Sequence, residues 1–268
     1  MRIRVAGDRL TGRAIDLRGY TLDAGAVAAA VRGDGAADLA IDCPDPGPVH
    51  DHVGVVRSDA SFSVRTALAA AARSRGHSAP ADDAIAETEA RLAEIDPPEI
   101  DLSEARRRVA EASDEEAALR ERVATLRGRV EAFRETDDDP AAVEAELTAA
   151  TRRLSEVETE RIAAEQALAR ARKRARESRE RRRERLRLAD RAANLRRDAR
   201  DHLAGAIRED FLAAREAVPG VPSDELATAL AVVRVASIDA PVVIAGDVPP
   251  FPDPDAASRW LEAPVLRV

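Results

Sequence analysis

Apolar residues recur every three or four positions along two long stretches in the middle of the chain, with charged residues between them. In the first stretch the recurring residues are Leu102, Ala105, Val109, Ala112, Glu116, Leu119, Val123, Leu126, Val130 and Phe133. In the second they are Val143, Leu147, Ala150, Leu154, Val157, Arg161, Ala164, Leu168, Ala171 and Ala175. Both stripes follow the a and d positions of heptads, which predicts two coiled-coil helices.

The two stripes match each other when the second is folded back on the first about a tip near residues 137–139. Val130 then lies opposite Leu147, and Glu116, the one charged residue of the first stripe, lies opposite Arg161, the one charged residue of the second. Such a pair adds little net stability, but a shifted register would bury each charge alone. We therefore expect an antiparallel hairpin in which Glu116 and Arg161 form a register-setting ion pair.

The charges of the two arms agree with this hairpin. Residues 82–139 carry 19 acidic and 9 basic side chains (net −10), whereas residues 140–217 carry 15 acidic and 20 basic ones (net +5). Arms of opposite charge attract, which favours pairing within one chain over pairing of identical arms between chains. Asp139 followed by Pro140 also fits the start of the return helix.

The two ends of the chain show short apolar runs that alternate with turn residues. Asp23 is expected to cap a helix over 24–31, and Ser61 to begin a helix that runs to Ala72. The Pro-Gly-Val-Pro segment at 219–222 is expected to end the long return helix. The apolar runs predict strands at 3–5, 15–17, 39–41, 53–56, 232–236, 242–245 and 265–268.

Neither end has the apolar content of a full domain, so we expect one head assembled from both ends. The predicted fold class is α+β: a small α/β head built from residues 1–80 and 218–268, with a long antiparallel coiled-coil hairpin of residues 81–217 inserted between them.

The composition indicates the surroundings of the protein. The chain holds 50 acidic residues and 41 arginines but a single lysine, Lys173, and only 2% of its residues are aromatic. Such an acidic, alanine-rich, lysine-poor composition resembles proteins of salt-loving archaea. One cysteine, Cys43, excludes an intrachain disulfide and fits a reducing interior. No apolar run approaches the ~18 residues of a membrane span, and no signal peptide is visible, so we expect a cytoplasmic protein.

The C-terminal stretch carries motifs that resemble those of SMC-type chromosome-maintenance ATPases, whose termini are likewise brought together by an antiparallel coiled coil. Residues 222–226, Pro-Ser-Asp-Glu-Leu, look like their signature motif, followed by a helix over 229–236 in place of the strand proposed above. Residues 241–247 are similar to a Walker B strand that ends in Asp247, and 250–261 resemble the D-loop and its helix. A buried strand followed by an acidic turn also occurs in many other α/β domains.

The departures from that family bear on activity. Nothing in the chain matches Gly-x-x-x-x-Gly-Lys-Ser/Thr, the only lysine lies in the coiled coil, and Val248 stands where the catalytic Glu would be. Without backbone amides and a lysine around the phosphates, the chain has no groups to bind and orient ATP for hydrolysis. The resemblance implies a degenerate relative, and we expect a protein that is no enzyme, with no catalytic residue and no cofactor.

Residues 170–191 hold twelve basic and four acidic side chains, the highest local charge of the chain. They could bind a polyanion such as DNA, without sequence preference because no aromatic residue is interleaved for base stacking. The candidate residues are Arg179, Arg181, Arg182, Arg183, Arg185 and Arg187. The alternative is a solvated helix section, because 178–180 lies opposite Pro97-Pro98, where the first arm must break.

His50, His52 and Cys43 are residue types that bind zinc, but no fourth ligand is indicated, so we expect no metal site. The sequence favours a non-catalytic coiled-coil scaffold or adaptor that binds an unknown protein partner. A homodimer fits the unpaired helix section. The alternative function is sequence-nonspecific nucleic-acid association through the arginine-rich helix at 170–191.

Overall fold

The computed structural model describes residues 1–268 except 36–37, 60, 136–138, 221 and 247–250. The chain is divided into two compact units, one of Met1–Thr88 with Arg191–Val268 and one of Glu89–Asp190. The first unit is the head and is built from both ends of the chain, as expected. The predicted head segments, 1–80 and 218–268, are shorter than the compact unit, which also includes the beginning of one hairpin arm and the end of the other.

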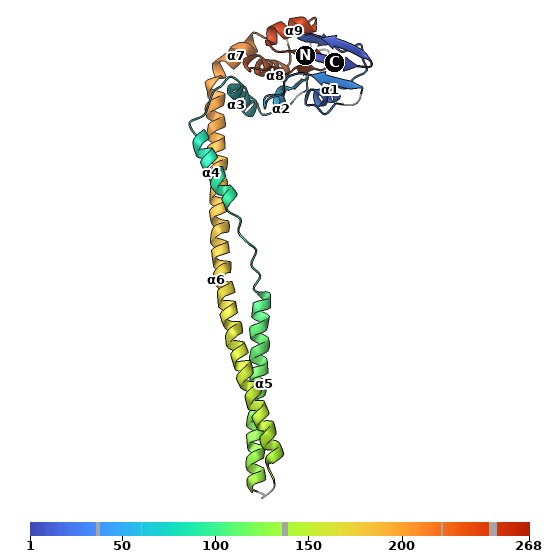
Figure 1. Ribbon diagram of the computed structural model, residues 1–268. Coiled ribbons are helices and arrows are strands. Elements are labelled where there is room, and N and C mark those ends of the chain that lie inside the picture. The colour runs from blue at the N-terminus through green and yellow to red at the C-terminus, as the bar shows by residue number, and fades with distance from the viewer. Residues whose placement is uncertain (36–37, 60, 136–138, 221, 247–250) are drawn as a thin grey trace. The chain divides into compact units, whose positions relative to one another are not determined.

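A parallel sheet brings the two ends of the chain together in the head (Figure 1). Its strands are β3 (Ala14–Asp16), β5 (Val55–Val56), β6 (Val242–Ile244) and β7 (Val265–Arg267), in the order β3-β7-β6-β5. All residues of β6 and β7 are buried. Val243 packs into one core while Val242 and Ile244 pack into another on the opposite face, as in a sheet covered on both sides.

A second, antiparallel sheet is formed by the N-terminal residues alone. Its strands are β1 (Arg2–Val5), β2 (Asp8–Thr11) and β4 (Leu39–Asp42), in the order β2-β1-β4. The connection between β1 and β2 has positive φ at Ala6 (49°) and Gly7 (93°), which suits a tight hairpin turn. Helix α1 (Ala24–Val31) is capped by Asp23, as predicted, and packs into the same core as β1.

The remaining head helices surround the core on the other face of the parallel sheet. They are α2 (His50–Val53), α3 (Val64–Ser74), α7 (Arg208–Glu216), α8 (Asp224–Val235) and α9 (Pro254–Leu261). Helix α8 lies at the centre of this core, with Leu230, Val232 and Val233 fully buried. The buried Arg267 of β7 donates hydrogen bonds to the carbonyls of Phe251 (3.2 Å) and Pro252 (3.1 Å), which ties β7 to the segment before α9.

Several predicted elements were wrong. Residues 232–235 are the end of α8 rather than a strand, because a short apolar run that is buried on all sides has no periodicity to distinguish helix from strand. The long helix ends at Ala206, next to Gly205, and α7 follows from Arg208. Helix α3 is capped by Ser63 instead of Ser61, and Val53 belongs to α2 instead of a strand.

The hairpin arms are α4 (Asp82–Glu94) and α5 (Ser103–Glu135) on one side and α6 (Ala141–Ala206) on the other (Figure 1). The predicted tip lies in part at 137–138, outside the described residues. Asp139 accepts a hydrogen bond of 3.0 Å from the Ala141 amide and so caps α6. Every predicted a and d position of α5 and α6 is buried or partly buried, which confirms both heptad stripes.

Candidate partner-binding surfaces of the hairpin

The charged layer of the seam is formed by Glu116 of α5 and Arg161 of α6. Arg161 Nε donates to Glu116 Oε2, and the carboxylate raises the pKa of the guanidinium. Only 3% of Glu116 is exposed. Its other oxygen pairs with Arg120 one turn along α5, and Arg161 pairs with Glu165 one turn along α6. The structure thus joins the two predicted residues and adds two neighbours, which were overlooked because i,i+4 pairs are common on charged helices.

Ion pairs beside the seam follow the same register. Arg153 lies 2.7 Å from Glu115, and Arg134 lies 2.6 Å from Glu144 near the tip. Glu115 raises the pKa of Arg153 through a side-chain hydrogen bond. These pairs are about half exposed, so each contributes little stability on its own. These ion pairs support the register of the hairpin, because they join the arms in the same antiparallel arrangement as the buried layer.

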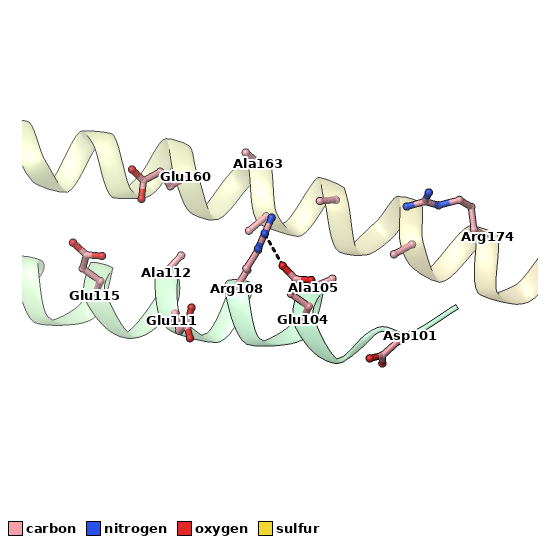
Figure 2. Close-up of a pocket in the computed structure, with 13 residues that line it drawn as sticks. Asp101, Glu104, Ala105, Arg108, Glu111, Ala112, Glu115, Glu160, Ala163 and Arg174 are labelled. Carbon is pink, nitrogen blue, oxygen red and sulfur yellow. Dashed lines mark hydrogen bonds and ion pairs between the residues drawn. The ribbon is translucent and has the colours of Figure 1, made fainter. Parts of the chain in front are cut away.

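An open groove of about 750 Å³ lies along α5 and α6 (Figure 2). Its apolar lining consists of alanines, namely Ala105, Ala112, Ala163, Ala164, Ala167 and Ala171. Four of these occupy a and d positions, where the larger residues used nearer the tip would fill the space between the arms. The sequence shows small residues that face one another in successive layers, but this pattern alone does not predict a groove.

The rim of the groove is acidic. Five carboxylates line it, those of Asp101, Glu104, Glu111, Glu115 and Glu160, against the two guanidinium groups of Arg108 and Arg174. Figure 2 shows Arg108 extending from α5 towards α6, with its ion pair of 2.6 Å to Glu104. The hydroxyl of Ser103 donates to Asp101 and lowers the pKa of that carboxyl. Asp101 therefore keeps its negative charge around neutral pH.

The arginine stretch of α6 follows the groove along the chain. The first arm is not helical between Glu94 and Ser103, and Ser178 donates a hydrogen bond of 2.5 Å to the carbonyl of Pro98 there. This contact agrees with the predicted break opposite 178–180. The six candidate arginines, Arg179, Arg181, Arg182, Arg183, Arg185 and Arg187, are all exposed. Within the described part of the chain, no ion pair joins any of them to another residue, so their charge is available to a partner.

The motif-like residues of the head have structural roles. Ser223 caps α8 by accepting a hydrogen bond of 3.3 Å from the Leu226 amide, and Asp253 caps α9. The Walker B-like Asp247 lies outside the described residues. Lys173, the only lysine of the chain, lies on α6 of the hairpin, 4.0 Å from Glu177.

The residues considered for zinc do not form a site. His50 is buried in α2, with Nε2 3.2 Å from the carbonyl of Ala240, and burial lowers its pKa. Cys43 is half-buried, which raises the pKa of its thiol. Among the residues that the structure describes, no group of three or more His, Cys, Asp and Glu side chains could hold a metal ion.

The fold and these surfaces define a class of protein: an α+β head with a coiled-coil hairpin inserted in its sequence. The chain belongs to a family of unknown function, DUF7856, which matches residues 12–265. No curated protein and no solved structure matches it. In the described ranges, no helix is both long enough and apolar enough to cross a bilayer.

Proposed function

We propose that the protein is a non-catalytic coiled-coil scaffold or adaptor, which uses its hairpin to set the distance and orientation of a bound protein. The observation that carries this proposal is the seam of α5 and α6, in which every predicted layer is at least partly buried and the charged layer is an ion pair. A fixed register makes the hairpin a stiff spacer. The alanine groove and the arginine stretch then offer a partner two chemically different surfaces.

The head, in this proposal, is a pseudo-ATPase related to SMC-type proteins. Two features support the kinship: the ends of the chain share one parallel sheet, and the signature-like residues begin a helix that packs into the core of that sheet. The missing Gly-x-x-x-x-Gly-Lys segment is the reason to exclude ATP hydrolysis. The acidic, lysine-poor composition supports a cytoplasm rich in salt as the place of action.

Site-specific photocrosslinking tests the scaffold. The protein is expressed in living cells with a benzophenone amino acid in place of Ala112 or Ala163, which line the groove. The matched control carries it in place of Arg127, an exposed residue on α5 outside the groove. The scaffold predicts one defined crosslinked protein from both groove positions and none from Arg127. Crosslinks that are absent, or equal at all three positions, contradict it.

The exposure of the six arginines favours a second candidate function, sequence-nonspecific binding of nucleic acid. Each phosphate neutralised should contribute about 0.9 to the slope of log affinity against log salt. Replacement of Arg181, Arg182 and Arg183 by Glu should abolish binding of a fluorescent DNA duplex in an anisotropy titration. The control carries the same charge change on α5, at the exposed Arg122, Arg127 and Arg129. If both variants bind alike, the arginine stretch is not the nucleic-acid site.

A further inference from the structure

We propose that the partner of the groove is a second copy of this chain, with the arginine stretch of each copy lying over the acidic groove of the other. The inference rests on the proposed use of the hairpin as a binding surface and identifies its occupant. Two copies would pair antiparallel along α6 about a two-fold axis at Arg174. Each copy would give and receive the same contacts, as a closed two-fold dimer requires.

The spacing of residues along α6 supports this axis. Residues seven or eleven positions apart lie on the same side of a helix. Ala163 and Ala167 line the groove eleven and seven residues before Arg174, which lines it as well. Arg181 and Arg185 follow Arg174 at the same two spacings, seven and eleven. A two-fold axis at Arg174 therefore brings Arg181 to the level of Ala167 in the other copy, and Arg185 to the level of Ala163.

Charge complementarity identifies the occupant. The groove is lined by five carboxylates and two guanidinium groups, so it favours a basic helix with small or flexible side chains over an acidic one. The long methylene stems of arginine can cover the alanine floor while the guanidinium groups reach the carboxylates of the rim. Asp101 lines the groove together with Arg174, so carboxylates are at hand where the two Arg174 side chains approach the axis.

The unpaired helix section gives a second reason. Arg181 and Arg185 are exposed and, among the described residues, have no ion-pair partner. Leu186, in the same section, is 66% exposed. The first arm is not helical between Glu94 and Ser103, so it leaves this section without a helical partner up to Glu184, which pairs with Arg91 of α4 at 3.6 Å. A second copy supplies one, and the pairing explains the arginine stretch without nucleic acid.

Light scattering on the size-exclusion peak of the full chain, in buffers of low and molar potassium chloride, measures the mass directly. The inference predicts a dimer of the 28.8 kDa chain. Reversal of Arg181 and Arg185 to Glu, or of Glu104 and Glu111 to Arg, should each weaken the dimer about 100-fold, because like charges would face each other. An equimolar mixture of the two variants should restore it as a heterodimer. Arg122→Glu with Arg127→Glu is the matched control and should leave the dimer unchanged.

A second measurement guards against misfolded variants. With Cys43 replaced by Ala, a cysteine at position 174 should form a disulfide between copies under mild oxidation, whereas one at the exposed position 127 should not. A monomeric wild-type chain, or a dimer that ignores both charge reversals and fails to crosslink at 174, overturns the inference. If the chain is monomeric but groove photocrosslinks yield another protein, the scaffold function stands and only the second-copy partner is wrong.

Discussion

Glu116 and Arg161 lie 45 positions apart in the sequence, yet Arg161 Nε donates to Glu116 Oε2 in the one charged layer of the hairpin seam. Glu116→Lys would place a cation beside Arg120 and Arg161, and Arg161→Glu would place a carboxylate beside Glu116 and Glu165. We expect each single change to lower the midpoint of thermal unfolding by several degrees. The double swap restores the pair between the arms but keeps the repulsion with Arg120 and Glu165, so it should recover part of that loss, as followed by circular dichroism.

The exposed pair Arg152 and Glu156, which lies within α6 outside the groove, is the control for this cycle. Its swap should show almost no coupling, because exposed i,i+4 pairs are worth only tenths of a kcal/mol. If the Glu116/Arg161 swap is no better than its two single changes added together, the ion pair does not set the register.

The alanine groove should tolerate a larger residue where the rest of the seam does not. Ala112 is partly buried and lines the groove, so Ala112→Leu can fill empty space and should stabilise the protein by about 1 kcal/mol. Ala150 is buried among larger apolar residues nearer the tip, so Ala150→Leu should destabilise it by about 1–3 kcal/mol. Chemical denaturation of the two variants compares them, and equal losses would mean that the groove is closed in solution.

The hairpin was predictable because the position of a residue in the heptad indicates whether its side chain faces the other arm or the solvent. The apolar residues repeat every seven positions over five layers, and only one register places Glu116 against Arg161, so pattern and charge agree. The helix starts at Asp23 and Asp139 were readable for a similar reason, since an acidic cap acts on the amides next to it in the chain.

The head was harder to predict because its order depends on contacts between distant segments. Strand β5 has only two residues and exists through its pairing with β6, which follows almost 190 positions later. Residues 229–233 of α8 are all buried, so this apolar run has no polar face to mark a helical period. His50 gained its role from the carbonyl of Ala240, which no local pattern could indicate.

Ser223 belongs to the segment that resembles a signature motif, but we expect it to act as the N-cap of α8. Its hydroxyl oxygen accepts from the Leu226 amide at the start of the central head helix. Ser223→Ala should therefore cost about 1 kcal/mol of unfolding free energy, while Ser223→Asp should retain most of it because aspartate is an equally good cap. Denaturant titration measures both. Equal losses in the two variants would show that the hydroxyl does more than cap α8.

His50 should make the stability of the head fall in mild acid. Burial lowers its pKa below the ordinary value of 6.5, so the folded head keeps the imidazole neutral while the unfolded chain takes up a proton. The stabilising contribution of neutral His50 is fully present above about pH 6.5 and is lost as the pH falls, by at most about 1.4 kcal/mol per pH unit.

His50→Gln, whose amide can still donate to the carbonyl of Ala240, should remove this part of the pH dependence of stability. The exposed His77 is the control, and His77→Gln should leave it in place. Denaturation at several pH values measures all three proteins, and an unchanged acid dependence in His50→Gln would place the sensitive group elsewhere.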